Sequence, residues 1–169
     1  MRPRTALLSL TTLACLALPG RVCAVTQTAA VKAKVIKPLT LEALRNLDLG
    51  TITLKPGSWS NATVGLSRTG VFSCASTNLI CSGPTSTARY KVTGSNKETA
   101  IISAPNVTLV NQSDPTRTLT LVVDNPGQVT LTSSGKQGST FDLGGSITLD
   151  STTASGDYTG TFNVTVDYQ

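Results

Sequence analysis

Apolar and polar residues alternate along most of the chain, and the alternation is most regular at its C-terminal end. Between residues 156 and 169 the odd positions from 159 to 167 hold threonine, asparagine or aspartate. The even positions hold Tyr158, Gly160, Phe162, Val164, Val166 and Tyr168. Because successive side chains of a strand point to opposite faces, this stretch predicts a half-buried strand of an antiparallel sheet.

The same alternation predicts further short strands. We expect them within residues 29–35, 47–54, 61–67, 70–74, 88–94, 99–103, 107–111, 119–123, 128–133 and 139–149. Turn-forming sequences such as "KPGS", "SDPT" and "DNPG" separate them. Many short strands at this spacing indicate one all-β domain, a sandwich or barrel with antiparallel pairing.

Two stretches depart from the strand pattern. Residues 39–49 are the one helical candidate, of a turn or two, because Leu41, Leu44 and Leu47 recur at every third position. The paired glycines of "LGGS" (143–146) lie between two apolar runs and predict a bulge or a turn.

The first 24 residues have the features of a secretory signal peptide. Arg2 and Arg4 precede an apolar run, and Val22 and Ala24 occupy the small-residue positions before a cleavage site. We therefore expect the mature β-domain to comprise residues 25–169 and to be exported. A lipoprotein signal at Cys15 is the alternative, but the apolar run continues past that cysteine. No later stretch has the length and apolarity of a transmembrane segment.

Removal of this segment changes the charge and the cysteine count. The formal charge falls from +5 to +2, since Arg2, Arg4 and Arg21 leave, and no basic stripe interleaved with aromatics supports nucleic-acid binding. Cys74 and Cys81 are the cysteines that remain, and an even pair in an exported chain predicts one disulfide. The chain has no histidine, which argues against a zinc site, and we expect no metal or cofactor.

Few kinds of catalysis fit this composition. Without histidine there is no Ser-His-Asp or Cys-His arrangement. A carboxylate pair of the glycosidase type remains arithmetically open, although most aspartates sit in turn-like sequences that they would cap. Trp59 and Tyr90 are candidate stacking surfaces for a carbohydrate, with packing as the alternative for Trp59.

The two ends of the mature chain carry a family resemblance. Fimbrial subunits of the bacterial chaperone–usher pathway place a tyrosine next to last and a glycine fourteen places from the end, where this chain has Tyr168 and Gly156. The stretch "LDLGTI" (47–52) is similar to the "L-x-F-G-x-I" stretch of many exported bacterial β-subunits, with Leu49 replacing the aromatic. From "AKVIKPLTL" to the terminal strand, the chain resembles the bacterial family called domain of unknown function 4402.

The resemblance implies an immunoglobulin-like sandwich that lacks one strand until a like subunit or a periplasmic chaperone supplies it. Head-to-tail repetition of such a contact would give a filament at the cell surface, a fimbria-like structural or adhesive assembly. The segment Thr28–Ile36 is then the donated strand, and the C-terminal strand stays in the sheet. The expected strand-exchange residues are Ala29, Val31, Ala33 and Val35 in the donor, and Gly156, Tyr158, Phe162, Val164, Val166 and Tyr168 in the acceptor.

Two other functions remain open. A self-complete secreted sandwich could bind a ligand such as a carbohydrate through Trp59 or Tyr90. More distantly, a carboxylate pair could support a hydrolase.

Overall fold

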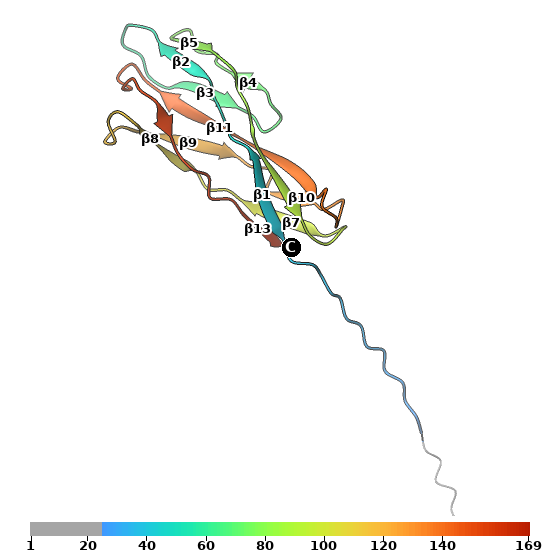
Figure 1. Cartoon of the computed structure of the whole chain (residues 1–169). Coiled ribbons are helices and arrows are strands. Elements are labelled where there is room, and N and C mark those ends of the chain that lie inside the picture. Colours follow the sequence, from blue (N-terminus) through green and yellow to red (C-terminus); the bar gives the residue numbers. More distant parts are fainter. Residues whose placement is uncertain (1–24) are drawn as a thin grey trace, which may run out of the picture. The chain divides into compact units, whose positions relative to one another are not determined.

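The computed structural model describes residues 25–169, and all its regular elements in that range are strands (Figure 1). The all-β prediction is therefore confirmed. The strands are β1 (Thr40–Arg45), β2 (Thr51–Leu54), β3 (Ala62–Leu66), β4 (Phe72–Ser73), β5 (Leu79–Ser82), β6 (Ala88–Thr93), β7 (Thr99–Ser103), β8 (Val107–Asn111), β9 (Thr118–Asp124), β10 (Gln128–Thr130), β11 (Ser139–Leu149), β12 (Tyr158–Thr159) and β13 (Thr165–Tyr168). The predicted signal peptide, residues 1–24, lies outside the described residues.

Antiparallel sheets build a curled sandwich from these strands. The largest sheet has the order β1-β6-β11-β9-β8-β12, and β3 and β4 are joined to it through β11. The smaller sheets are β10-β7-β13 and β2-β5. Along one edge, β11 pairs first with β6, through Ser139–Leu143, and then with β3, through Gly145–Leu149. This long strand therefore belongs to both halves of the sandwich.

The hydrophobic core consists of two clusters, one in each half. The strands place alternate residues in it, as in β3, where Ala62, Val64 and Leu66 are buried and Thr63 is exposed. The first cluster contains Ala62, Val64, Leu79, Val107, Leu121, Ile147 and Leu149. The second contains Ala88, Val92, Ala100, Ile102, Leu131, Phe141 and Leu143. Buried and exposed side chains thus alternate along these strands with the period of two that the sequence predicts.

The N-terminal strand predicted within residues 29–35 is not formed in this chain. Residues 25–39 carry no regular secondary structure, and Val31 and Val35 are each 93% exposed. The compact unit begins at Val35 and continues to Gln169. Alternation makes a segment compatible with a sheet, but a strand also needs a neighbour for its backbone N–H and C=O groups.

The helical turn predicted within residues 39–49 is wrong. This stretch forms β1, which pairs with β6 through Leu41 opposite Val92 and Ala43 opposite Tyr90. The register shifts between Ala43 and Arg45, and Leu44 in that bulge is 47% exposed. The recurrence of leucine at every third position therefore reflects a strand with an inserted residue.

The bulge or turn predicted at "LGGS" is also wrong, because Gly144 and Gly145 lie inside the continuous strand β11. A Cβ atom on Gly144 would overlap the carbonyl oxygen of Leu66 and the backbone of the next two residues. The glycine is needed for the close approach of the chain that follows β3, at the point where β11 changes partner.

Candidate functional site: an open groove beside the C-terminal strand

The C-terminal stretch predicted as one strand is divided between two sheets. Its first part, β12, pairs with β8, and its second part, β13, pairs with β7. Residues 160–164 between them belong to no strand. The alternation itself is confirmed, because Phe162, Val164, Val166 and Tyr168 are half-buried while the residues between them are exposed. The stretch bridges the two halves of the sandwich.

Each of the strands β1, β2, β12 and β13 of the described chain has one edge without a paired strand. The strand β12 pairs only with β8, and β13 pairs only with β7. The strands β1 and β2 likewise pair only with β6 and β5. Backbone groups along an open edge are a template for pairing with a further strand.

A groove lies between the segment that contains β1 and β2 and the segment that contains β12, and we call it the edge groove. Its first hollow, of about 710 Å³, lies between residues 41–50 and residues 158–164. An adjoining hollow of about 990 Å³ lies between residues 50–54 and residues 153–159. The two share Gly50, Tyr158 and Thr159, so the edge groove continues along both β1 and β2. The residue numbers rise along one wall and fall along the other, so the walls run antiparallel.

The floor of the edge groove is apolar. In the first hollow it is made by Ala88, Tyr90, Val107, Leu109 and Leu121, which belong to the core clusters or pack against them. The ring of Tyr90 stacks on that of Phe141 with 5.5 Å between centroids, and burial raises the pKa of Tyr90. The hydrophobic core is therefore reachable from solvent along the groove. Two open backbone edges above an apolar floor suit an extended apolar segment.

Tyr168, the next-to-last residue, ties the C-terminal strand to the rest of the sandwich. Its hydroxyl accepts a hydrogen bond from the backbone N–H of Ser95 at 2.7 Å and donates one to the carbonyl oxygen of Lys37 at 2.6 Å. The C-terminal strand is thereby tied to the segment that leads into β1, and Figure 1 shows the C-terminus beside the start of that strand. This contact gives the penultimate tyrosine a structural role.

The substitution Tyr168→Phe tests this contact. We expect it to lower the free energy of unfolding by about 2 kcal/mol, because the N–H of Ser95 and the carbonyl of Lys37 both lose their partner. The matched control is Tyr158→Phe, which removes one local bond to the carbonyl of Ala154 and should cost about 1 kcal/mol or less. Urea unfolding measures both, and equal losses would contradict the assigned role.

The far end of the C-terminal stretch is held by Asn111, a residue that sequence reasoning missed. This side chain is 0% exposed. Its Oδ1 accepts hydrogen bonds from the backbone N–H of Ser113 at 2.8 Å and of Asp114 at 3.2 Å. Its Nδ2 donates to the carbonyl of Ser155 at 3.0 Å. The only signal in the sequence is a polar residue at the inward position that follows Val107 and Leu109 in β8.

Gly156 packs directly on this asparagine. Its φ is +142°, and a Cβ atom there would lie 2.5 Å from Oδ1 and 2.6 Å from Nδ2 of Asn111. Only glycine combines that backbone conformation with the close approach. The glycine fourteen places from the end is thus explained by the buried side chain beneath it.

The substitution Gly156→Ala is expected to lower the free energy of unfolding by about 2–4 kcal/mol, because it adds backbone strain and an overlap with Asn111. Gly127→Ala is the control, since Gly127 also has a positive φ, +76°, but nothing within 4 Å of its Cβ position. The control should cost about 1–2 kcal/mol. Thermal or urea unfolding separates the two, and a Gly156→Ala variant as stable as the control would disprove the overlap.

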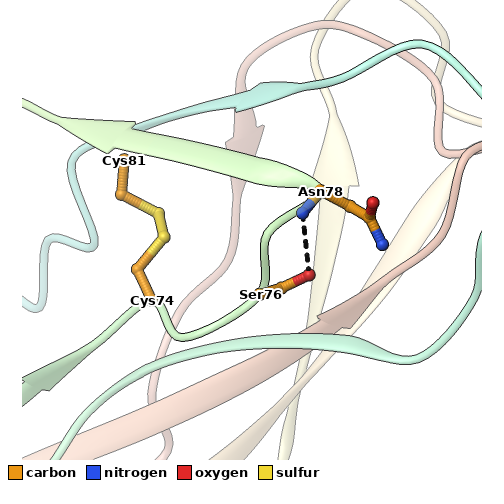
Figure 2. The surroundings of a disulfide bond; sticks show 4 residues. All are labelled: Cys74, Ser76, Asn78 and Cys81. Carbon is orange, nitrogen blue, oxygen red and sulfur yellow. Dashed lines mark hydrogen bonds between the residues drawn. A yellow bond between two sulfur atoms is a disulfide. The ribbon is translucent and has the colours of Figure 1, made fainter.

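The predicted disulfide is present. Cys74 and Cys81 are bonded, with Cα atoms 6.4 Å apart, and the bond joins the end of β4 to β5 (Figure 2). Inside the closed loop the backbone N–H of Asn78 donates to Oγ of Ser76 at 3.2 Å. The sequence did not predict β5, whose second half contains Cys81 and which pairs with β2.

The residues considered for carbohydrate stacking have packing roles. Trp59 is half-buried against the first core cluster, and its indole N–H donates to the carbonyl of Lys55 at 3.0 Å. Tyr90 packs against the second cluster at the floor of the edge groove.

Several carboxylates form ion pairs or cap turns. Hydrogen bonds from Arg89 at 2.8 Å lower the pKa of Asp142, whereas hydrogen bonds from Thr116 and Thr152 lower the pKa of Asp114 and of Asp150. A lowered pKa keeps these groups ionised, which suits a turn cap or an ion pair rather than a general acid. Within residues 25–169 no group of three His, Cys, Asp or Glu side chains is arranged to hold a metal.

The described residues contain no helix of the length and apolarity needed to cross a membrane.

Comparison with known proteins gives one match. No curated protein and no solved structure matches the chain. A family model described as a domain of unknown function (DUF4402) matches residues 39–168, which include β1 to β13 and both walls of the edge groove. The chain belongs to the DUF4402 family.

Proposed function

We propose that this protein is a non-catalytic subunit that assembles by β-strand addition, and that its edge groove receives the N-terminal segment of a second copy. The observation that carries the proposal is the groove itself, with the unpaired edges of β1 and β12 in its walls and core residues as its floor. A strand laid between antiparallel walls is parallel to one wall and antiparallel to the other, and both kinds of ladder are stable.

The segment Thr28–Ile36 has the chemistry that the groove requires. Ala29, Val31, Ala33 and Val35 share one face when the segment is extended, and this face would lie on the apolar floor. A strand of this length extends over about 30 Å. In each chain the segment carries no strand of its own, so it needs no unfolding before it is donated.

The charge of the segment Thr28–Ile36 also favours it as the strand that occupies the edge groove. The opposite face of the segment carries Lys32 and Lys34, which would project outward between the two walls. Glu42 on β1 and Asp167 on β13 are both exposed, and Glu42 already pairs with Lys91, with 2.6 Å between Oε2 and Nζ. Lysines near acidic side chains favour pairing with these edges over an arbitrary apolar segment.

The proposal places assembly outside the cytoplasm, after removal of residues 1–24. The Cys74–Cys81 bond supports this, because disulfides form and persist in oxidising compartments. A strand from a periplasmic chaperone would occupy the same groove before assembly, and a fimbria-like filament at the cell surface would be the product.

A peptide-binding measurement tests the proposal. A peptide of residues 25–36 is expected to bind a domain of residues 37–169 in isothermal titration calorimetry, and to slow hydrogen exchange in residues 160–164. The control peptide carries Val31→Ser and Val35→Ser, which keep the length and the lysines but remove apolar area from the inward face. The proposal fails if the two peptides bind equally or if neither binds.

A further inference from the structure

We propose that Pro38 keeps the N-terminal segment of each chain out of that chain's own edge groove, so that the segment is donated to another copy. This inference rests on the proposed function. It concerns the choice between two occupants with the same sequence, the chain's own segment and the segment of a neighbour.

The chain enters the sandwich just before β1, which lines one wall of the edge groove. The backbone N–H of Lys37 donates to Oγ of Ser95 at 2.7 Å, and its carbonyl accepts from the hydroxyl of Tyr168 at 2.6 Å. Leu39 lies close by, because a Cβ atom on Gly94 would be 2.5 Å from that hydroxyl and 2.8 Å from Cδ2 of Leu39. The path of the chain is thus fixed on both sides of Pro38.

A segment that filled its own groove would have to reverse direction at this point. From Leu39 the chain runs into β1 along one wall, so a segment folding back beside β1 would form a hairpin with it. The shortest hairpin would have Lys37 and Pro38 as its two central residues. Such two-residue hairpins use type I′ or type II′ turns, and both need a positive φ at the first central residue.

The residues at this position do not allow either turn without strain. Pro38 has its φ fixed near −65°, which excludes the second position of a type I′ turn. Lys37 precedes proline and is therefore restricted to extended conformations, which opposes the positive φ of a type II′ turn. In the structure the non-glycine residues with positive φ among those described are Asn61 and Lys97, so Lys37 is not in that region.

A longer hairpin loop between the N-terminal segment and β1 does not make self-filling of the groove favourable. It would take Val35 and Ile36 out of the returning strand and leave Val31 as its only valine on the inward face. A second copy donates the same segment without any turn, and so keeps the whole inward face. Pro38 thereby favours assembly over self-filling.

The test compares three mature chains of residues 25–169: the wild type, Lys37→Asn, and Lys37→Asn with Pro38→Gly. Asn-Gly is the preferred pair for a type I′ turn. A segment joined by so short a turn has an effective concentration on the order of millimolar at its own groove, far above that of a second copy at micromolar protein. Lys37→Asn alone keeps the proline and is the matched control.

Sedimentation velocity over a range of concentrations and hydrogen exchange in residues 160–164 give the readouts. We expect the wild type and Lys37→Asn to associate, and the double variant to stay monomeric at concentrations roughly tenfold higher, with slowed exchange in residues 160–164. If the double variant associates as strongly as Lys37→Asn, the role of Pro38 is disproved while strand addition stands. A monomeric wild type with exchange already slowed would also disprove it, because the chain would be filling its own groove. A monomeric wild type with rapid exchange would instead overturn the proposed function, and this inference with it.

Discussion

A chain of residues 37–169 is expected to stay folded and to remain monomeric at concentrations at which a chain of residues 25–169 associates. Residues 25–36 contain no strand, and neither core cluster includes any of them. Their removal should therefore change the free energy of unfolding by less than about 1 kcal/mol. It should abolish association completely, because under the proposed function it removes the donated strand. Sedimentation velocity and urea unfolding measure the two effects.

The control for this deletion keeps the segment but changes its inward face. Replacing Ala29, Val31, Ala33 and Val35 by serine retains the length, the backbone groups and the lysines. This variant should associate much more weakly than the wild type, since burial of a valine side chain alone contributes about 1.5–3 kcal/mol. Association that survives the deletion would assign the contact between copies to another surface.

The largest loss of stability is expected from Asn111→Ala. The substitution leaves the N–H groups of Ser113 and Asp114 and the carbonyl of Ser155 without their partner in a partly buried site, and it opens a cavity below Gly156. Together these effects should cost about 3–5 kcal/mol. Hydrogen exchange should rise first in residues 155–159, because Asn111 holds the start of that stretch.

Thr108→Ala is the control for this substitution. Thr108 lies on the same strand as Asn111, but its side chain is exposed. We expect a change within about 0.5 kcal/mol in urea unfolding. An Asn111→Ala variant that is about as stable as this control would show that the hydrogen bonds of the asparagine do not position the C-terminal stretch.

Most strands could be predicted from the sequence because burial in a sandwich follows the alternation of side chains. The predicted ranges around β3, β7, β8 and β11 all contain the strand that forms. The errors occur where strand pairing, rather than the pattern of hydrophobic and polar residues, decides the local structure. The spacing of Leu41 and Leu44 in β1 reflects a bulge rather than a helical turn, and a pair of glycines in β11 serves close packing rather than a turn.

The candidate site was predictable in part. Gly156 and Tyr168 could be predicted from the family resemblance. The structure explains both residues, because Gly156 packs on Asn111 and the hydroxyl of Tyr168 donates a hydrogen bond to the carbonyl of Lys37. Asn111 itself could not be found, because a buried amide is recognised by its three partners, which come from two separate turns. The edge groove could not be found either, since it depends on which strand edges stay unpaired.

The lengthwise course of the edge groove also has a mechanical consequence. Backbone hydrogen bonds between antiparallel strands run perpendicular to the strands. A pull along a strand seated in the groove would therefore load the whole ladder in shear, and many bonds would have to break together. A pull across the groove would peel them apart one at a time. Under the proposed function, tension directed along β1 and β12 is thus the load that a seated strand would resist best.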